Sequence, residues 1–285
     1  MPAFAYVNGR YAPIRDARVA VEDRGFQFAD SIYEVVAIVG GRCIDWEKHC
    51  WRLRRNAAAL FLGGLPTDAV LGQIAARLTA LSRYRDALLY VQLSRGPARR
   101  DHGLPAAPQP TLVLTIRRYD PAARLAQAQG GVAAITLPDQ RWGRCDIKAT
   151  GLLFAVMAKE EARRAGAYEA LLVRDGVVTE GSSTNAWLVD AAGGLVTHPL
   201  SAHILPGIAR DTLLGLARSA GIAVAERPFT PAEAAGAREL FLTSTSSFVM
   251  PVVRLDGAAV GSGAPGPVTR RLAALYAESL GTAAG

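Results

Sequence analysis

The 285-residue sequence lacks several features that would place it in a specialised class of protein. No apolar run is long enough to span a bilayer, and residues 1–4 lack the charged start and apolar middle of a signal peptide. Only three cysteines are present, Cys43, Cys50 and Cys145, an odd and widely spaced set that predicts reduced thiols rather than a disulfide framework. We therefore expect a cytoplasmic protein without a membrane partner.

Common cofactor and hydrolase motifs are missing as well. The chain has no GxxxxGK[ST] loop, and its GxGxxG match at residues 261–266 precedes the C-terminal helix, with no strand after it to complete a βαβ unit. Both observations disfavour a dinucleotide- or NTP-binding enzyme. Ser182 and Ser183 do not lie in a GxSxG elbow, so serine hydrolysis has little support. No metal is expected, because metal-ligand spacing to cysteines or acids is lacking at His49, His102, His198 and His203.

The charge balance is basic, with a formal net charge of +7. The arginines are scattered through amphipathic segments, with no basic tail and no aromatic-basic stripe, so nucleic acid is not an expected partner. A small anionic substrate and a phosphate-bearing cofactor would account for some of the positive charge, and solvated faces for the rest.

Residues 1–120 are expected to form a small α+β domain. Asn8-Gly9, flanked by apolar residues, predicts a hairpin over residues 6–11, and residues 22–29 predict a loop or short helix. Apolar patterning predicts three further strands and two helices. The strands are expected over 31–39, 88–93 and 111–116, and the helices over 46–61 and 67–82.

Residues 121–128 are expected to be a linker and residues 129–285 a larger domain. Its pattern is a strand, a loop, a helix over 150–165 and then further strands, with a hairpin at Asp175-Gly176. The remaining strands are expected over 169–173, 186–189, 195–197 and 239–243, with helices over 209–219 and at the C-terminus. Strands in hairpins and meanders, with helices grouped between them, favour α+β rather than a doubly wound parallel sheet.

Lys148 is a candidate catalytic nucleophile. It follows a turn over residues 142–145 and an acid, and it precedes the predicted helix. A lysine that forms an imine must be neutral when it attacks, so it needs a site that disfavours its charge. Taken alone, however, Lys148 would be an ordinary surface lysine. The hypothesis depends on the motifs around it.

Three features could bind a phosphate group. Residues 205–210 place a glycine-containing turn directly before a helix, whose free N–H groups and dipole attract anions. Residues 243–246 end a strand with hydroxyls, and Arg52 could add a guanidinium. Taken singly, the first is better explained by a plain helix start and Arg52 by a surface position, and the second is as well explained by a solvated strand end.

Five segments in one order resemble the fold-type IV enzymes that use pyridoxal 5′-phosphate (PLP). This group contains the branched-chain aminotransferases, the D-amino acid aminotransferases and aminodeoxychorismate lyase. The resemblance covers almost the whole chain and implies a two-domain α+β fold with the PLP site between the domains. The segments are EDRGFQFADSIYE (22–34), RWGRCDIK (141–148), TEGSSTN (179–185), LPGIARD (205–211) and ELFLTST (239–245).

The resemblance implies cofactor roles for matching residues. Lys148 would hold PLP as a Schiff base and move the proton during catalysis, and Glu180 would keep the pyridine nitrogen protonated. Arg141 and Tyr168 would lie around the ring hydroxyl. Ala209 stands where relatives often have threonine, so one hydroxyl contact to phosphate would be missing. The remaining cofactor-binding residues would be Arg52, Ser183, Ile208, Ala209, Ser244 and Thr245.

The loop over residues 94–103 indicates the class of substrate. Arg100 and His102 resemble an arginine and histidine that, together with a tyrosine matching Tyr33, bind the α-carboxylate in D-amino acid aminotransferases. The alternative is a solvated hairpin tip. The resemblance also implies that this loop reaches the site of a neighbouring subunit in a homodimer.

The predicted activity is a ping-pong transamination from D-amino acids, such as D-alanine or D-glutamate, to pyruvate or 2-oxoglutarate. The alternatives on the same fold are an (R)-amine or L-branched-chain transaminase and a lyase of the aminodeoxychorismate type. A basic binding protein with an ordinary Lys148 is the non-enzymatic alternative.

Overall fold

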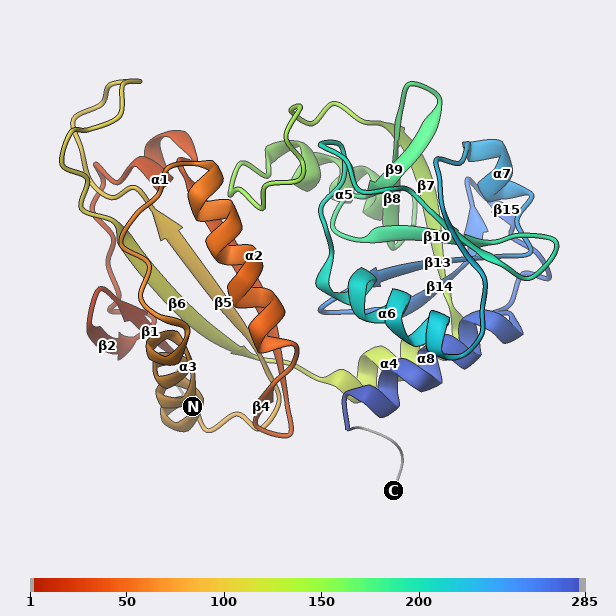
Figure 1. Cartoon of the computed structure of the whole chain (residues 1–285), viewed down its shortest axis with the longest axis horizontal. Coiled ribbons are helices and arrows are strands. Elements are labelled where there is room, and N and C mark those ends of the chain that lie inside the picture. The colour runs from red at the N-terminus through yellow and green to blue at the C-terminus, as the bar shows by residue number, and fades with distance from the viewer. Residues whose placement is uncertain (1–2, 282–285) are drawn as a thin grey trace. The chain divides into compact units, whose positions relative to one another are not determined.

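The computed structural model describes residues 3–281, which divide into two compact units. The first unit is Met1–Asp120 together with Ile147–Leu152, and the second is Pro121–Asp146 together with Leu153–Gly285. The chain thus contributes two separate stretches to each unit, and Lys148 belongs to the shorter stretch of the first. Figure 1 shows the elements of both units.

The first unit is built on an antiparallel sheet that has six strands among the described residues, in the order β2-β1-β6-β5-β3-β4. Its strands are β1 (Phe4–Val7), β2 (Arg10–Pro13), β3 (Ser31–Val39), β4 (Arg42–Cys43), β5 (Ala87–Ser94) and β6 (Thr111–Arg118). Its helices are α1 (Arg24–Phe28), α2 (Trp46–Ala59) and α3 (Asp68–Ser82).

Local chemistry explains why these elements form. The β1–β2 hairpin turns at Asn8 and Gly9, with φ of 41° and 92°, the left-handed conformation that Asn-Gly favours in tight hairpins. Helix α3 begins after Thr67, whose side chain accepts a hydrogen bond from Val70 N and so caps the helix. The predicted hairpin, the strand at 31–39 and the helices at 46–61 and 67–82 are confirmed.

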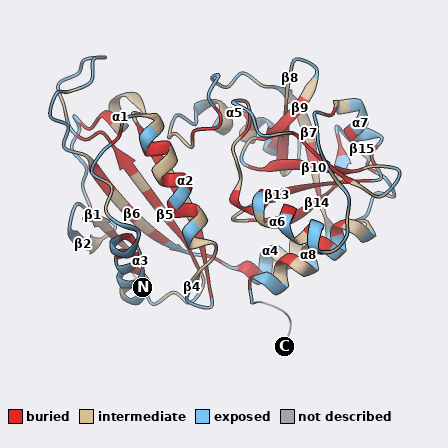
Figure 2. Cartoon of the chain, viewed as in Figure 1, coloured by how far each residue is buried: buried red, intermediate tan, exposed pale blue. Residues whose placement is uncertain are grey.

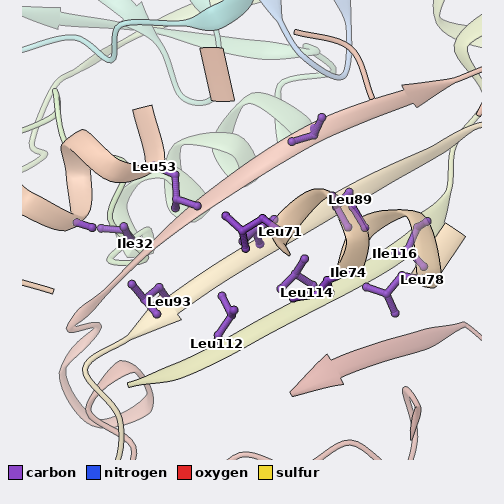
Figure 3. Packing of buried hydrophobic residues seen from close by; sticks show 14 of the residues in the cluster. Ile32, Leu53, Leu71, Ile74, Leu78, Leu89, Leu93, Leu112, Leu114 and Ile116 are labelled. Carbon is purple, nitrogen blue, oxygen red and sulfur yellow. The ribbon is translucent and has the colours of Figure 1, made fainter. Parts of the chain in front are cut away.

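One face of this sheet packs against α2 and α3. Alternate residues of three strands form the sheet side of the core, because successive side chains of a strand point to opposite faces. Figure 3 shows Ile32 of β3, Leu89 and Leu93 of β5 and Leu112, Leu114 and Ile116 of β6 among the helix residues Leu53, Leu71, Ile74 and Leu78. The odd-numbered residues of β3, including Tyr33, consequently point to the other face.

The second unit contains a mixed sheet with nine strands among the described residues. The order is β12-β11-β10-β13-β14-β7-β8-β9, with β15 paired to β14. The pairs β11–β12, β14–β7 and β7–β8 are parallel, and the other pairs within residues 3–281 are antiparallel. The predicted α+β class is confirmed. The strands are β7 (Val132–Pro138), β8 (Glu169–Arg174), β9 (Val177–Gly181), β10 (Asn185–Val189), β11 (Leu195–Thr197), β12 (Val224–Glu226), β13 (Glu239–Ser244), β14 (Phe248–Leu255) and β15 (Ala258–Ala259).

The helices of the second unit are α4 (Pro121–Gly130), α5 (Leu153–Arg164), α6 (Ile208–Ser219), α7 (Pro231–Ala235) and α8 (Pro267–Ser279). Residues 121–128, which were expected as a linker, lie within α4. This helix packs against the core of its unit through Ala128. Pro121 is the first residue of α4, a position that tolerates proline because its missing N–H is not needed for the helical hydrogen bonds.

Burial in each unit is concentrated on the sheets and on the helix sides that face them, as Figure 2 shows. Over residues 3–281, none of the helices has the length and apolar character needed to cross a bilayer.

Candidate active site

Lys148 lies along the open edge of β3. Strand β4 pairs with β3 only near Ile38 and Val39, so the beginning of β3 is available to another segment. Residues 148–150 take that place: Tyr33 N donates to Lys148 O at 3.0 Å, and Thr150 N donates to Ser31 O at 3.1 Å. Two backbone hydrogen bonds therefore fix the position of the candidate nucleophile relative to β3.

The amine of Lys148 lies over an aromatic face. Its Nζ is 4.3 Å from the centroid of the Tyr33 ring, and that ring stacks on Tyr90 with centroids 5.4 Å apart. The structure thus brings together the predicted nucleophile and one predicted substrate-binding residue.

Arg52 lies on the other face of β3, in a buried cluster with Glu34 and His49. Its Nε donates to Glu34 Oε1 at 2.7 Å and its Nη2 to Glu34 Oε2 at 2.8 Å, while His49 Nδ1 is 2.7 Å from Glu34 Oε2. Burial alone would raise the pKa of Glu34, but the charge and hydrogen bonds of Arg52, helped by His49, bring it down to about 2. Arg52 is therefore a fixed, carboxylate-paired arginine rather than a surface one.

Sequence reasoning missed the partners of Arg52. The signal was the polar Glu34 at a position of β3 whose neighbours Ile32 and Val36 face the core. His49 was considered only as a metal ligand. Because neighbouring residues of a strand point to opposite faces, the structure does not group Arg52 with Lys148 around Tyr33.

The loop over residues 94–103 lies against α1. Arg24 N donates to Gly96 O at 3.0 Å, and Asp23 forms a bridge with Pro97. In this loop, Arg100 and His102 both contact the ring of Phe28. The two residues predicted to bind a carboxylate are therefore neighbours in space.

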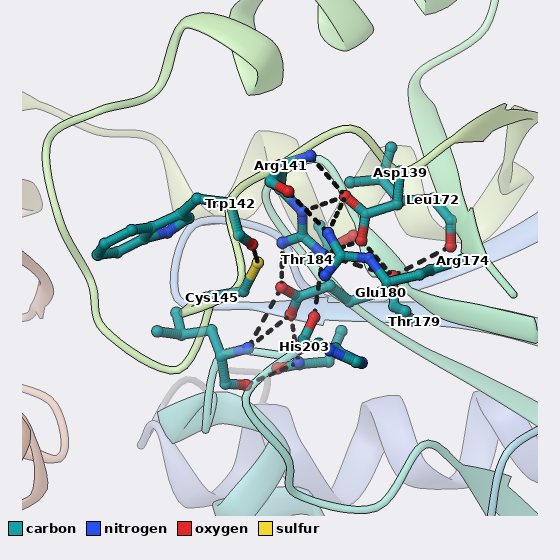
Figure 4. A network of polar contacts seen from close by, with 12 residues as sticks. Asp139, Arg141, Trp142, Cys145, Leu172, Arg174, Thr179, Glu180, Thr184 and His203 are labelled. Carbon is teal, nitrogen blue, oxygen red and sulfur yellow. Dashed lines mark hydrogen bonds and ion pairs between the residues drawn. The ribbon is translucent and has the colours of Figure 1, made fainter.

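In the second unit, Glu180 is the centre of a polar network (Figure 4). Its carboxylate accepts hydrogen bonds from Arg141 Nη1, from Asn185 Nδ2 at 3.0 Å and from Leu205 N at 3.1 Å. The residue is only 4% exposed. Three donors on separate segments thus fix the orientation of the carboxylate.

Arg141 is held in turn by Asp139. Its Nε donates to Asp139 Oδ1 and its Nη2 to Asp139 Oδ2, both at 2.9 Å. Burial disfavours the charged forms of Asp139 and Arg141, but the ion pair between them outweighs the effect of burial. Arg141 lowers the pKa of Asp139. Asp139 and Glu180 together raise the pKa of Arg141. Arg141, predicted beside a ring hydroxyl, is in the structure the charged partner of Glu180. Asp139 was not predicted, because the sequence places it in an ordinary loop after β7.

Asn185 joins Glu180 to the beginning of α6. Its Nδ2 also donates to Leu205 O at 3.0 Å, and a Cβ built on Gly207 would lie 2.0 Å from its Oδ1. In the sheet it pairs with Thr243, at the end of β13. Asn185 therefore links the acid and the turn before α6 through its side-chain amide, and it adjoins the hydroxyl-rich end of β13 through strand pairing.

The beginning of α6 offers donors suited to a phosphate group. The helix starts after Gly207, whose position provides no capping side chain, so the amides of Ile208 and Ala209 keep their anion-binding character. After β13, Ser244 Oγ lies 2.7 Å from Ser247 Oγ and accepts from Ser247 N at 3.0 Å. Thr245 lies within this turn. Free helix N–H groups and hydroxyls are the kinds of donor that bind a phosphate.

Two predicted cofactor residues have other partners. Ser183 Oγ donates to Glu169 Oε2 at 3.1 Å. Tyr168 immediately precedes β8, and its N donates to Ala133 O near the beginning of the parallel strand β7. Arg141 follows the opposite end of β7. Burial raises the pKa of Tyr168, and a hydrogen bond to Ser247 opposes this effect. The structure therefore groups Tyr168 with the serine turn and not with Arg141.

The structure places Lys148 over the ring of Tyr33, and it binds the buried Glu180 to the backbone of Leu205, just before the uncapped start of α6. The family model described as amino-transferase class IV matches residues 31–255, and this chain belongs to that family. A D-alanine aminotransferase from Bacillus licheniformis is 39% identical over 273 residues, which cover 96% of this chain and 95% of that protein.

Solved structures show the same fold. A branched-chain aminotransferase from Thermoproteus uzoniensis, solved with norvaline, has a TM-score of 0.88 at 24% identity and covers 99% of this chain and 96% of that chain. A hypothetical aminotransferase from Mycobacterium tuberculosis, in a PLP-bound form, has a TM-score of 0.84 at 21% identity and covers 98% of this chain and 99% of that chain. The expected fold-type IV architecture is confirmed.

Proposed function

We propose that this chain is a PLP-dependent transaminase that moves the amino group of D-amino acids to a 2-oxo acid such as pyruvate or 2-oxoglutarate, by a ping-pong mechanism. The observation that carries the proposal is the amine of Lys148 held 4.3 Å above the ring of Tyr33 by backbone pairing with β3. The similarity to a D-alanine aminotransferase over almost the full length supports the substrate class.

PLP, when bound, supplies an electron sink for the pair released at the substrate Cα. Lys148 Nζ would hold the cofactor covalently and would be the group that moves a proton to and from the substrate Cα. Glu180, which Arg141 and Asn185 orient, would pair with the pyridine nitrogen of the cofactor. Its fixed orientation matters because the acid must keep that nitrogen protonated.

The phosphate is assigned to the amides of Ile208 and Ala209 and to the hydroxyls of Ser244 and Thr245, as the anion-binding start of α6 suggests. Arg52 would bind the phosphate while it remains ion-paired with Glu34, so its position depends on that ion pair. Ser183 and Tyr168 remain predictions, each with a different partner in the structure.

Tyr33, Arg100 and His102 would bind the substrate carboxylate. An arginine fork matches the two carboxylate oxygens, and the other two side chains add donors. The proposal includes a homodimer, because the resemblance assigns the loop over residues 94–103 to the site of a neighbouring subunit. It also includes the cytoplasmic location expected from the sequence.

The test is a half-reaction screen without an acceptor, following the absorbance of bound PLP. D-alanine is expected to convert the cofactor to its amine form, whereas L-alanine and L-leucine leave it unchanged. Rapid conversion by L-leucine alone would indicate a branched-chain enzyme, and conversion by an (R)-amine alone would indicate an amine transaminase. Sustained product formation without an acceptor would indicate a lyase.

A further inference from the structure

Phe28, the last residue of α1, contacts both residues assigned to the substrate carboxylate. The Cζ of Arg100 lies 4.8 Å from the centroid of the Phe28 ring, and the centroid of the His102 ring lies 5.6 Å from it at an interplanar angle of 48°. We propose that Phe28 is a positioning residue that holds Arg100 and His102 in the arrangement that binds a carboxylate. This inference rests on the proposed function.

Arg100 needs such a support because it is an exposed residue on a loop. A long side chain there loses conformational entropy when it binds a ligand in one geometry. The negative face of an aromatic ring attracts a guanidinium and restricts its position. Gln27, the preceding residue of α1, adds a long hydrogen bond, with Arg100 Nη1 donating to Gln27 Oε1 at 3.5 Å.

The ring of Phe28 is itself braced by Arg24. The Cζ of Arg24 lies 4.9 Å from the ring centroid, and the side chain is almost fully buried, with Nε donating to Asp30 Oδ2 at 2.8 Å. Its Nη1 donates to Asp101 O at 2.6 Å and to Gly103 O at 3.2 Å. Arg24 thus fixes the backbone on both sides of His102 to the helix that carries Phe28.

The beginning of the loop is tied to the same acid. Arg95 Nε donates to Asp30 Oδ2 at 2.7 Å, and its Nη2 donates to Asp30 Oδ1 at 2.9 Å. Asp30 therefore binds both Arg24 of α1 and Arg95 of the loop, and this shared ion pair fixes the position of the loop relative to α1. Within this group of residues, Phe28 contacts the side chains of both Arg100 and His102.

These contacts imply that Phe28 affects the binding of substrate and not the binding of PLP. Among the described residues, the aromatic and cation–π contacts of Phe28 run to Arg24, Arg100 and His102. Lys148 and the Arg52–Glu34 pair make their contacts elsewhere. Loss of the ring should therefore weaken binding of both carboxylate substrates and leave PLP in place.

The test uses the full-length holoenzyme and Phe28→Leu, which keeps an apolar side chain and removes the aromatic face. The KM for D-alanine and the KM for pyruvate are both expected to rise about two- to five-fold, the equivalent of ~0.5–1 kcal/mol for a contact to an exposed arginine at ~1.4 kcal/mol per tenfold. Because only uniform binding is lost, kcat and PLP per chain should stay at the wild-type level. Phe28→Tyr, which retains the ring, should restore both KM values.

Phe26→Leu is the matched control, since Phe26 lies on the same helix and is 78% exposed. It should have wild-type KM values. In an Arg100→Ala background, Phe28→Leu should add much less to KM than in the wild type, because residues that act through one another are not additive.

The inference is overturned if Phe28→Leu leaves KM unchanged, if Phe26→Leu raises it equally, or if the effects of Phe28→Leu and Arg100→Ala are fully additive. Loss of PLP in parallel with the rise in KM would likewise show a merely structural role. Failure of the proposed function looks different: the wild-type enzyme itself would give no half-reaction with D-alanine.

Discussion

Arg52 donates to both carboxylate oxygens of Glu34, at 2.7 and 2.8 Å, and each of the two residues is at most 3% exposed. A buried, bidentate pair of this kind is sensitive to the loss of one partner, because the other charge then stays buried without compensation. Arg52, which is proposed to bind the phosphate of PLP, therefore also contributes to the stability of the first unit.

Glu34→Gln should therefore destabilise the protein by ~3–5 kcal/mol, the usual cost of breaking a buried pair. Chemical denaturation measures this directly. Glu160→Gln is the control, because Glu160 forms an exposed pair with Arg163 and Arg164 and should change stability very little. Equal effects of the two substitutions would contradict the assignment.

The same pair predicts a pH dependence. The pKa of Glu34 is about 2 in the folded chain, below its ordinary value of 4.5. A lowered pKa means that the stabilisation is fully present above the ordinary value and is lost as the pH falls toward 2. The wild type should lose stability more steeply across this window than Glu34→Gln does, as measured by denaturation at a series of pH values. Parallel profiles would disprove this role.

Substitution by alanine should have opposite effects on stability at two glycines, Gly207 just before α6 and Gly215 within it. Gly207→Ala would place a Cβ 2.0 Å from Asn185 Oδ1, displacing the amide that holds Glu180 and Leu205. We expect a loss of ~1–3 kcal/mol in stability and weaker PLP binding. Gly215→Ala meets nothing within 4 Å and should stabilise the helix by ~0.5–1 kcal/mol. Thermal unfolding and PLP titration of the apoprotein measure both effects, and tight PLP binding by Gly207→Ala would contradict the role of Asn185.

Arg100→Ala should raise the KM for D-alanine about 10- to 150-fold, since a hydrogen bond to a charged group contributes ~1.5–3 kcal/mol. PLP retention should not change, because Arg100 is assigned to substrate alone. Arg99→Ala removes the neighbouring charge and should have a much smaller effect. Steady-state kinetics and cofactor content distinguish the two, and loss of PLP in Arg100→Ala would refute the assignment.

Glu180→Gln tests the electrostatic role of the acid. The variant keeps an oxygen for the Asn185 and Leu205 donors, and Arg141 retains Asp139, so the fold should survive. Without the negative charge near the pyridine nitrogen, kcat should fall about 10²–10³-fold, the usual loss for one preorganised electrostatic group. Single-turnover kinetics with D-alanine measure the change. A wild-type rate would remove Glu180 from the mechanism.

Elements with strong local chemistry could be predicted from the sequence. Strand β3 has the predicted bounds, and the Asn8-Gly9 hairpin and the Thr67 cap follow from residues adjacent in the chain. Strand β14 was missed because Pro251 lies within it. Its pairing with β7 begins only at Val252, so the missing N–H of the proline is tolerated.

The site was predictable where a motif is contiguous and less so where partners come together through strand register. The pairing of Glu34 with Arg52 depends on which face of β3 meets α2. The separation of Tyr168 from Arg141 depends on the parallel register of β7 and β8. Neither relationship is visible in residue spacing alone.

The most direct test of the account is to identify the residue that is joined to PLP. The chain has three lysines, Lys48, Lys148 and Lys159, so borohydride reduction followed by peptide mass spectrometry gives an unambiguous answer. A phosphopyridoxyl adduct is expected on the peptide that contains Lys148, and it should be retained in Lys159→Ala and lost in Lys148→Ala. An adduct on Lys48 or Lys159, or a reduced protein with no adduct, would contradict this expectation.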